Sequence, residues 1–357
     1  MAEFRIVTHN IRLASPGNIQ SNEKPWKQRL PLIINELKYH TRFLDGRNLV
    51  HASKPANGSS NKDVTNHGRA EGHAESRQSP AASIICLQEC EHVQVVDLLT
   101  SMNDREPDAK PITSLTKVAS GPYWAYVGVG REDGATQGEH SPILYPVLIF
   151  DLVHWDNTWL SETPDRPSKD WNANCIRILT SAVLENKFTK QRIAVFNTHL
   201  DNESKQARAK SIDIILSKIE SLTTTYAVHE LHRLPFVFTG DFNAHQHDPA
   251  YQNLTSSLVA GGVVDSFEAV SPTQRYGAEQ TFTGFQPWLG TKEDQGEKGR
   301  IDYVFFGPRG QAEGSGEGST EAVWKIEGYA ALSNETESRL YCSDHRAVVA
   351  DAVLNAQ

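Results

Sequence analysis

The feature that most constrains the fold of this chain is a series of short apolar runs, each followed directly by polar residues that can do chemistry. Residues 83–90 (SIICLQEC) form a continuous apolar run of strand length, as expected for a strand covered on both faces. Similar runs predict further strands at residues 4–11, 124–129, 143–153, 176–184, 192–199, 236–240, 301–306 and 346–354. The sequence therefore predicts a β-rich core whose strand ends present polar side chains.

Only a few stretches have the spacing of a helix. Apolar residues predict one helix between Trp26 and Leu37, and Pro31 indicates that its regular part begins near that residue, where a missing N–H is harmless. Similar spacing predicts helices over residues 93–100 and 212–219. Because a doubly wound sheet needs a helix between nearly every pair of strands, we expect instead an α/β fold of two stacked mixed sheets with helices outside.

Two segments interrupt this pattern without dividing the chain. Residues 46–82 contain few large apolar residues, a composition that cannot repay its ordering entropy, so we expect a mobile surface insertion there. Residues 311–319 (QAEGSGEGS) are expected to form a flexible loop. Because strands on both sides of each segment are needed for one core, residues 1–357 are predicted to form a single domain.

Composition narrows the class of protein. With 38% hydrophobic residues the chain can build a sizeable core, and its net charge of −9 argues against binding nucleic acid by bulk charge alone. No apolar run approaches the roughly 20 residues of a membrane span, and the start of the chain resembles a strand, not a secretory signal. The four cysteines lack paired CxxC motifs, so buried free thiols are expected at Cys86 and Cys90. We expect an intracellular, cytoplasmic protein with no membrane contact and no obligate protein partner.

The polar residues that follow the strands form the candidate site. They are Asn10, Glu89, Glu139 with His140, Arg177, His199 with Asp201, Asp241 with Asn243, Asp302, and Asp344 with His345. Catalytic groups are commonly carried at strand ends and in loops above a rigid scaffold. If the strands all deliver these residues to one edge of the fold, they converge on a single site.

The oxygen donors in this set favour a hard metal ion. Glu89, Asp344 and the amide of Asn10 suit Mg²⁺ or Mn²⁺ better than zinc. His199 and His345 suit hydrogen bonds to phosphate oxygens. The combination predicts metal-dependent hydrolysis of a phosphoester, which needs positioning and charge stabilisation more than covalent help.

The remaining residues suit proton transfer and phosphate binding. Asp302 can pair with His345, fix its tautomer and raise its basicity. Asp241 is then available to activate or orient water, and Asn243 to bind a phosphoryl oxygen. Each residue alone has a structural alternative, such as a cap at Asp344 or a surface acid at Glu89. Their joint occurrence at successive strand ends favours the functional interpretation.

Taken in order, these residues resemble the endonuclease/exonuclease/phosphatase superfamily of DNase I-like enzymes. The similarity is closest to small metal-dependent hydrolases near the deadenylase branch. It rests on VGVGREDG (127–134), GEHSPILY (138–145), WLSETPDRP (159–167), NTHLDNESKQAR (197–208), GDFNA (240–244) and TFTGF (281–285). The resemblance implies a four-layer α/β/β/α sandwich.

The resemblance also implies roles for individual residues. Glu89 resembles the principal metal ligand, with Asn10 beside it and Asp344 at or near the metal. Asp241 resembles the water-activating acid and Asn243 the phosphate-binding amide. The remaining catalytic assignments are His345 held by Asp302, His199 with Glu139 as its partner, and Arg177 approaching the phosphate.

The substrate class stays open at this point. A small phosphomonoester or phosphodiester fits the acidic charge, whereas a deadenylase-like 3′–5′ exoribonuclease or other nuclease acting on single-stranded nucleic acid fits the family branch. Trp124, Trp171 and Trp288 could stack bases or pack at the edge of the sandwich. A binding protein that has lost its chemistry is a further alternative, although none of the expected residues is missing. A serine hydrolase is disfavoured because the chain has no GxSxG motif.

Overall fold

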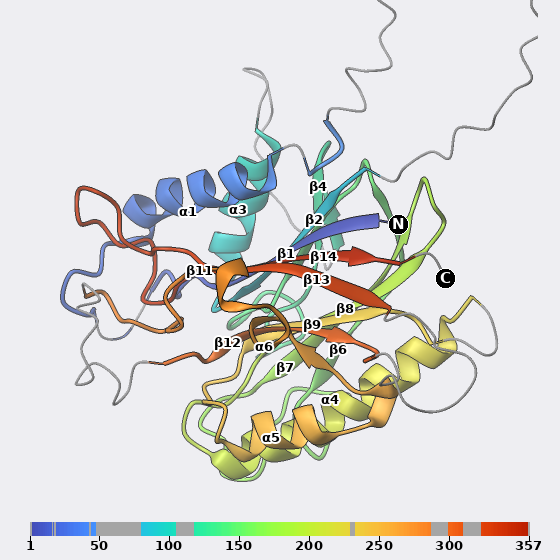
Figure 1. Cartoon of the computed structure of the whole chain (residues 1–357). Coiled ribbons are helices and arrows are strands. Elements are labelled where there is room, and N and C mark those ends of the chain that lie inside the picture. Colours follow the sequence, from blue (N-terminus) through green and yellow to red (C-terminus); the bar gives the residue numbers. More distant parts are fainter. Residues whose placement is uncertain are drawn as a thin grey trace, which may run out of the picture.

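The computed structural model describes residues 2–47 apart from positions 16, 18 and 43, and residues 80–104, 118–228, 233–286, 299–309 and 323–355. Within these residues, two β-sheets pack face to face and helices cover the outer face of each sheet, which confirms the expected four-layer α/β/β/α sandwich (Figure 1). The insertion expected at 46–82 lies outside the described residues except for its two ends, and the loop expected at 311–319 lies wholly outside them.

The first sheet has eight described strands in the order β11-β13-β14-β1-β2-β5-β4-β3. They are β1 (Ala2–Asn10), β2 (Ala82–Gln88), β3 (Val118–Ser120), β4 (Trp124–Val127), β5 (Ile143–Pro146), β11 (Arg275–Gly277), β13 (Trp324–Ala331) and β14 (Val348–Leu354). Because β1 pairs antiparallel with β14 and parallel with β2, the sheet is mixed. The parallel pair places the carboxyl ends of β1 and β2 at the same edge.

The second sheet has six described strands in the order β10-β12-β9-β8-β7-β6. They are β6 (Phe150–Trp159), β7 (Ile178–Asn186), β8 (Arg192–His199), β9 (Phe236–Asp241), β10 (Val264–Asp265) and β12 (Asp302–Gly307). β8 and β9 are parallel, and β12 runs antiparallel to β9. The ends of β8 and β9 and the beginning of β12 therefore meet at one edge.

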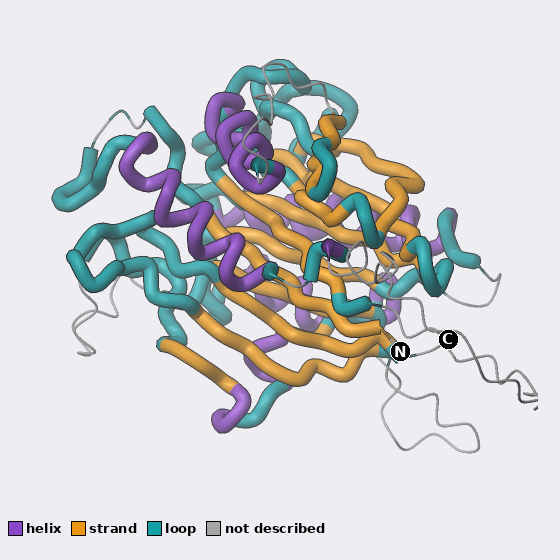
Figure 2. The backbone as a smooth tube through the Cα atoms, turned by 90° about the horizontal axis from the view of Figure 1, so that it is seen from above, coloured by secondary structure: helices purple, strands orange, loops and turns teal. Residues whose placement is uncertain are grey.

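Two helices cover each sheet. The helices and 3₁₀ turns are α1 (Trp26–Thr41), α3 (His92–Asn103), α4 (Lys205–Thr225), α5 (Pro249–Ser256), α6 (Ser266–Ala269), η1 (Val259–Gly261) and η2 (Pro272–Gln274). α1 and α3 pack on the eight-stranded sheet, and α4 and α5 pack on the six-stranded sheet. Seen from above, helices lie over the strands of the sheet beneath them (Figure 2).

The continuous apolar run of β2 follows from its position between two other layers. Every residue of this strand is buried. Ile84 and Cys86 belong to the core between the sheets, whereas Ile85 and Leu87 belong to the core under α1 and α3. Since successive side chains of a strand point to opposite faces, both faces of a central strand must be apolar here.

The first helix begins earlier than Pro31 suggested. α1 starts at Trp26 and contains Pro31 within it. The guanidinium of Arg29 is buried and donates to the carbonyl oxygens of Ile11 at 2.6 Å and Lys24 at 2.9 Å. These tertiary hydrogen bonds hold the first turn in place, which offsets the helical hydrogen bond that a proline removes.

Three other features differ from the expected pattern. The single strand expected over residues 143–153 is two strands that belong to different sheets, β5 to the eight-stranded sheet and β6 to the six-stranded sheet, and β13 falls where no strand was expected. Val93 of α3 was expected to face the core but is 51% exposed. The buried side of that helix is formed by Val95, Leu98, Leu99 and Met102. Periodicity alone therefore located the helix without fixing its orientation.

The cysteines and helices agree with two further expectations. All four cysteines are free, and Cys86, Cys90 and Cys342 are buried. Among the helices in the described ranges, none is both long enough and apolar enough to cross a membrane.

Candidate active site

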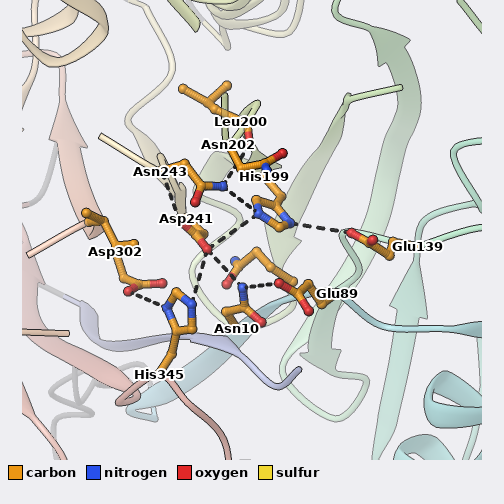
Figure 3. Close-up of polar contacts among 12 residues, drawn as sticks. Asn10, Glu89, Glu139, His199, Leu200, Asn202, Asp241, Asn243, Asp302 and His345 are labelled. Carbon is orange, nitrogen blue, oxygen red and sulfur yellow. Dashed lines mark hydrogen bonds and ion pairs between the residues drawn. The ribbon is translucent and has the colours of Figure 1, made fainter. Parts of the chain in front are cut away.

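The strand registers bring the predicted residues to one edge of the sandwich. Asp241, the last residue of β9, lies opposite His199 at the end of β8 and opposite Asp302 at the start of β12. Asn10 ends β1 on the neighbouring sheet, and Glu89 directly follows β2. The strand-end residues of both sheets therefore meet across the inner space of the sandwich (Figure 3).

The amide of Asn10 joins two carboxylates at the centre of this cluster. Its Nδ2 donates to Glu89 Oε1 at 2.9 Å and to Asp241 Oδ2 at 2.8 Å. Its Oδ1 accepts from the backbone N–H of Arg12 at 3.0 Å, which fixes the orientation of the amide. Asp241 is fully buried, so its carboxylate is held with little freedom to move.

The imidazole of His345 lies between two aspartates. His345 Nδ1 is 2.9 Å from Asp302 Oδ2, and its Nε2 is 3.6 Å from Asp241 Oδ2. Burial alone lowers the pKa of this ring, but the two carboxylates outweigh it and raise the pKa to about 10. The two carboxylates therefore favour the protonated form of His345, and Asp302 sets its orientation.

Asn243 and His199 form the adjoining part of the site. The backbone N–H of Asn243 donates to Asp241 Oδ1 at 2.8 Å, and its side-chain Nδ2 lies 2.8 Å from His199 Nε2. Asn243 has a φ of 48°, a left-handed conformation that asparagine tolerates better than most residues. The turn after β9 therefore directs both its backbone and its amide toward the site.

Glu139 lies among three basic groups on the far side of His199. Its Oε2 is 2.9 Å from Arg131 Nη1, 3.5 Å from His199 Nδ1 and 3.6 Å from Arg177 Nη1. Burial raises the pKa of Glu139, but the nearby His199 imidazole and the two guanidinium groups more than reverse this and lower it to about 2. This corner carries more basic groups than carboxylates.

The corner formed by Glu89 and Asp344 has the opposite character. Glu89 Oε2 accepts from the backbone N–H of Leu13 at 3.2 Å and lies 3.9 Å from Arg12 Nη1. Gln20 Nε2 donates to Asp344 Oδ2 at 3.1 Å. Burial and the Glu89 carboxylate raise the pKa of Asp344, although His345 and Arg12 oppose the change. A carboxylate whose pKa is raised by burial and by a neighbouring carboxylate is stabilised by a bound cation.

The donors of this corner fit a hard divalent ion. Glu89 and Asp344 offer carboxylate oxygens, which Mg²⁺ and Mn²⁺ prefer, whereas Asn10 presents its Nδ2 and not its Oδ1 to Glu89. Asp241, Asp302 and His345 also have ligand atoms within 4.8 Å of one another. In that second group, however, the imidazole Nδ1 already lies 2.9 Å from Asp302 Oδ2, so these two ligand atoms are already paired with each other.

The structure also identifies residues that the sequence did not single out. Arg131 joins Glu139, and Arg12 lies beside Glu89. Gln88 Nε2 donates to Asn197 Oδ1 at 2.7 Å and links the two sheets behind the site. Arg131 lies within the 127–134 stretch that carried the family resemblance, which was the available signal.

Other candidates are not brought to the site. Trp124 is fully buried under the helices of the eight-stranded sheet and so cannot stack on a base. His140 is buried, and its Nδ1 lies 3.1 Å from the carbonyl oxygen of Cys90. Trp171 is partly exposed, and Trp288 lies outside the described residues.

A polar cavity of about 600 Å³ adjoins the site at Asn243. Its lining includes Lys205, His245, His247, Glu279 and Gln280. Most of these side chains can donate or accept hydrogen bonds, so the cavity suits a hydrophilic molecule of small size.

Known proteins share the family and the fold of this chain. A model of the Endonuclease/Exonuclease/phosphatase family matches residues 18–345, and no curated protein matches the chain. A family member from Bacteroides thetaiotaomicron has a TM-score of 0.68 and 26% identity, with 99% of this chain and 98% of that chain covered. A mannosyl-6-phosphatase from the same species has the same TM-score and identity, with 98% and 100% covered.

A more distant structure, TDP2 of D. rerio in complex with a single-stranded DNA product, has a TM-score of 0.56 and 14% identity, with 98% and 99% covered. At that identity the likeness shows the fold alone. The match of the family model over nearly the whole chain, together with two structures that align end to end, establishes the relationship. This chain belongs to the endonuclease/exonuclease/phosphatase family and is an enzyme of the phosphoesterase class.

Proposed function

We propose that this enzyme is a Mg²⁺- or Mn²⁺-dependent phosphoesterase in which Asp241 activates the attacking water. The observation that carries the proposal is the position of Asp241, which is buried and central to the site. Its two oxygens contact the side chain of Asn10 and the backbone of Asn243, and Oδ2 lies 3.5 Å from His199 and 3.6 Å from His345. A carboxylate held at the centre of phosphate-binding groups is well placed to orient a nucleophile.

The acidic corner is proposed to hold the divalent ion. Glu89 is the principal ligand, with Asn10 beside it and Asp344 near it. When bound, the ion supplies positive charge that polarises a phosphoryl oxygen. The two carboxylates, Glu89 and Asp344, and the raised pKa that burial and Glu89 give to Asp344 support this location.

The remaining groups are proposed to hold the phosphoryl group. Asn243, His199 and Arg177 present donors on one side, and the protonated His345 presents its Nε2 on the other. Asp302 keeps His345 in a fixed orientation, and Glu139 does the same for His199 and Arg177. Donors that are already positioned before the reaction stabilise developing charge without reorganisation.

The substrate is proposed to be the phosphomonoester of a small hydrophilic molecule, such as a sugar phosphate. The polar cavity beside Asn243 has room for such a group, and the net charge of −9 disfavours a long polyanion. The similarity to a mannosyl-6-phosphatase along the whole chain supports the same choice. The chain is proposed to form a single catalytic domain, because both sheets contribute residues to the site. Its four free cysteines support a reducing, intracellular setting.

The test measures phosphate release from a panel of sugar phosphates beside cleavage of a labelled single-stranded RNA. Each reaction is run with Mg²⁺, with Mn²⁺ and with a chelator, and Asp241→Asn serves as the inactive control. Release of phosphate that requires metal and is lost in the variant supports the proposal. Cleavage of RNA from its 3′ end without release from any sugar phosphate would instead assign the exoribonuclease activity.

A further inference from the structure

A second cluster of metal-ligand side chains lies on the opposite face of β1 from the active site. His9 of β1, Glu36 of α1 and Cys342 before β14 place ligand atoms within 4.8 Å of one another. His9 is fully buried, Cys342 is 4% exposed, and the Glu36 side chain is 13% exposed. Because neighbouring side chains of a strand point to opposite faces, His9 faces the helices while Asn10 faces the site.

The contact between His9 and Glu36 is not an ordinary hydrogen bond. His9 Nδ1 lies 3.2 Å from Glu36 Oε1, a distance that permits a hydrogen bond. Yet within the described part of the chain neither atom makes one, so the two groups are not aligned with each other. Two buried polar atoms that lie close together without bonding suggest that both are directed at a common third point.

The other ring nitrogen of His9 strengthens this interpretation. His9 Nε2 lies 3.4 Å from the carbonyl oxygen of His345, which can only accept a hydrogen bond. A proton on Nε2 leaves a lone pair on Nδ1, facing the carboxylate of Glu36. Metal-binding histidines characteristically direct their second nitrogen at a backbone carbonyl or carboxylate in this way.

We propose that His9 Nδ1, Glu36 Oε1 and Cys342 Sγ form a site for a zinc-type transition metal ion. Nitrogen, sulfur and carboxylate oxygen are the ligands that zinc takes in proteins. In a tetrahedral site with bonds of about 2.0–2.3 Å, neighbouring ligand atoms lie about 3.3–3.8 Å apart. The His9–Glu36 separation of 3.2 Å fits this spacing, and the two pairs that include Cys342, which lie within 4.8 Å, need to close by at most about 1.5 Å.

A cavity beside the cluster provides the fourth position. It has a volume of about 250 Å³ and is lined by Glu36, Cys342, His40 and Glu335 among others. This space admits a water ligand and gives the ion a path from solvent. The site is separate from the oxygen-donor corner at Glu89, and its donors favour a softer metal than Mg²⁺.

An ion here would connect elements that present catalytic residues. Cys342 precedes Ser343, whose Oγ donates to the carbonyl oxygen of Asn10 at 2.6 Å. Binding to the folded state alone raises stability by mass action. The expected role is therefore to fasten α1, β1 and the segment before β14 together behind the active site.

The test uses Co²⁺ as a spectroscopic substitute for zinc. The full-length protein is stripped with a chelator, freed of it, and titrated with Co²⁺ in excess Mg²⁺. We expect thiolate-to-cobalt charge-transfer absorption that saturates at one equivalent and disappears on addition of Zn²⁺. Cobalt at the Glu89 corner gives no such signal, because the donors proposed there are oxygens. Zinc should also raise the Tm of the wild type.

Matched cysteine variants identify the ligand. Cys342→Ala should lose both the absorption and the zinc-induced rise in Tm, whereas Cys86→Ala, at a buried cysteine between the sheets, should keep them. If Cys342→Ala does not fold, Glu36→Gln at the partly exposed helix position should weaken Co²⁺ binding at least tenfold. Absence of the absorption in the wild type, or unchanged binding in these variants, would reduce the cluster to an ion pair and overturn the proposal.

Discussion

The two corners of the active site carry opposite charge although they are built from the same kinds of residue. In one, the Glu139 carboxylate is surrounded by Arg131, Arg177 and His199, and its pKa falls to about 2. In the other, burial and Glu89 raise the pKa of Asp344. The same functional group is thus stabilised as an anion in one corner and destabilised in the other.

This difference indicates how the work of the site is divided. The Glu139 corner has an excess of positive groups already in place, as a phosphate site requires. The Glu89 corner has an excess of carboxylates, and Arg12, its neighbouring cation, also pairs with Glu23. The first corner is complete without added ions, whereas the second gains most from a bound divalent cation.

The largest effect is expected for the residue that lies between the corners. Asp241→Asn keeps the size and shape of the side chain but removes the charge and the basicity. We expect kcat to fall at least about 1000-fold, within the range assigned to general acid–base catalysis. Steady-state kinetics on the active sugar phosphate measures it, and circular dichroism checks the fold. A loss smaller than tenfold would remove Asp241 from the proposed role.

The second-largest effect is expected on the Mg²⁺ requirement, and only for changes in the acidic corner. Glu89→Gln removes the charge of the principal ligand, so we expect the Mg²⁺ concentration for half-maximal activity to rise by at least about 100-fold. A Mg²⁺ titration of activity measures this. Glu139→Gln is the matched control, because the same change in the basic corner should leave the Mg²⁺ requirement within about threefold. Equal shifts of the Mg²⁺ requirement in both variants would contradict the assignment of metal binding to the acidic corner alone.

The fold could be predicted from the sequence to a greater extent than the details of the site. A strand buried on both faces, such as β2, can be recognised in the sequence as a continuous apolar run. β8 was expected at the residues where it occurs. Site residues at strand ends, such as Asn10 and Asp241, could be located because polar residues of types common in active sites directly follow apolar runs. β13 was missed because polar and apolar residues mix along it, with only part of the strand buried.

The contacts that set the charge of each corner were less predictable. Arg131 reaches Glu139 from a loop eight positions earlier, and no local pattern specifies that meeting. Arg29 overrides the helix-breaking preference of Pro31 through hydrogen bonds to distant carbonyls. The first contact is set by the conformation of one loop and the second by the packing of segments far apart in the chain, so periodicity and propensity carry little information about either.

A third prediction concerns the basic corner itself. Glu139→Gln leaves Arg131 and Arg177 without their carboxylate, so we expect KM for substrate to rise about tenfold and the free energy of unfolding to fall by about 3 kcal/mol at neutral pH. Substrate kinetics and urea unfolding at pH 7 measure the two effects.

The pH dependence separates this charge effect from lost packing. Because the pKa of Glu139 is lowered from 4.5 to about 2 in the folded state, its ionised form contributes stability above pH 4.5. That contribution is lost as the pH falls from 4.5 toward 2, so the difference between wild type and Glu139→Gln should shrink over this range. A difference that stays constant would assign the loss to packing and contradict the electrostatic explanation.

The smallest effect is expected in the polar cavity that adjoins Asn243. Lys205 lines that cavity at the start of α4 but is exposed, so water and salt screen its charge. Lys205→Met should raise KM about threefold at low salt and less at high salt, with kcat unchanged. Lys210→Met on the same helix is the matched control, because Lys210 pairs with Asp213 and does not line the cavity. Equal effects of the two variants would show that the substrate responds only to the overall electrostatic field of the protein. The cavity would then not be the binding site for the part of the substrate beyond its phosphoryl group.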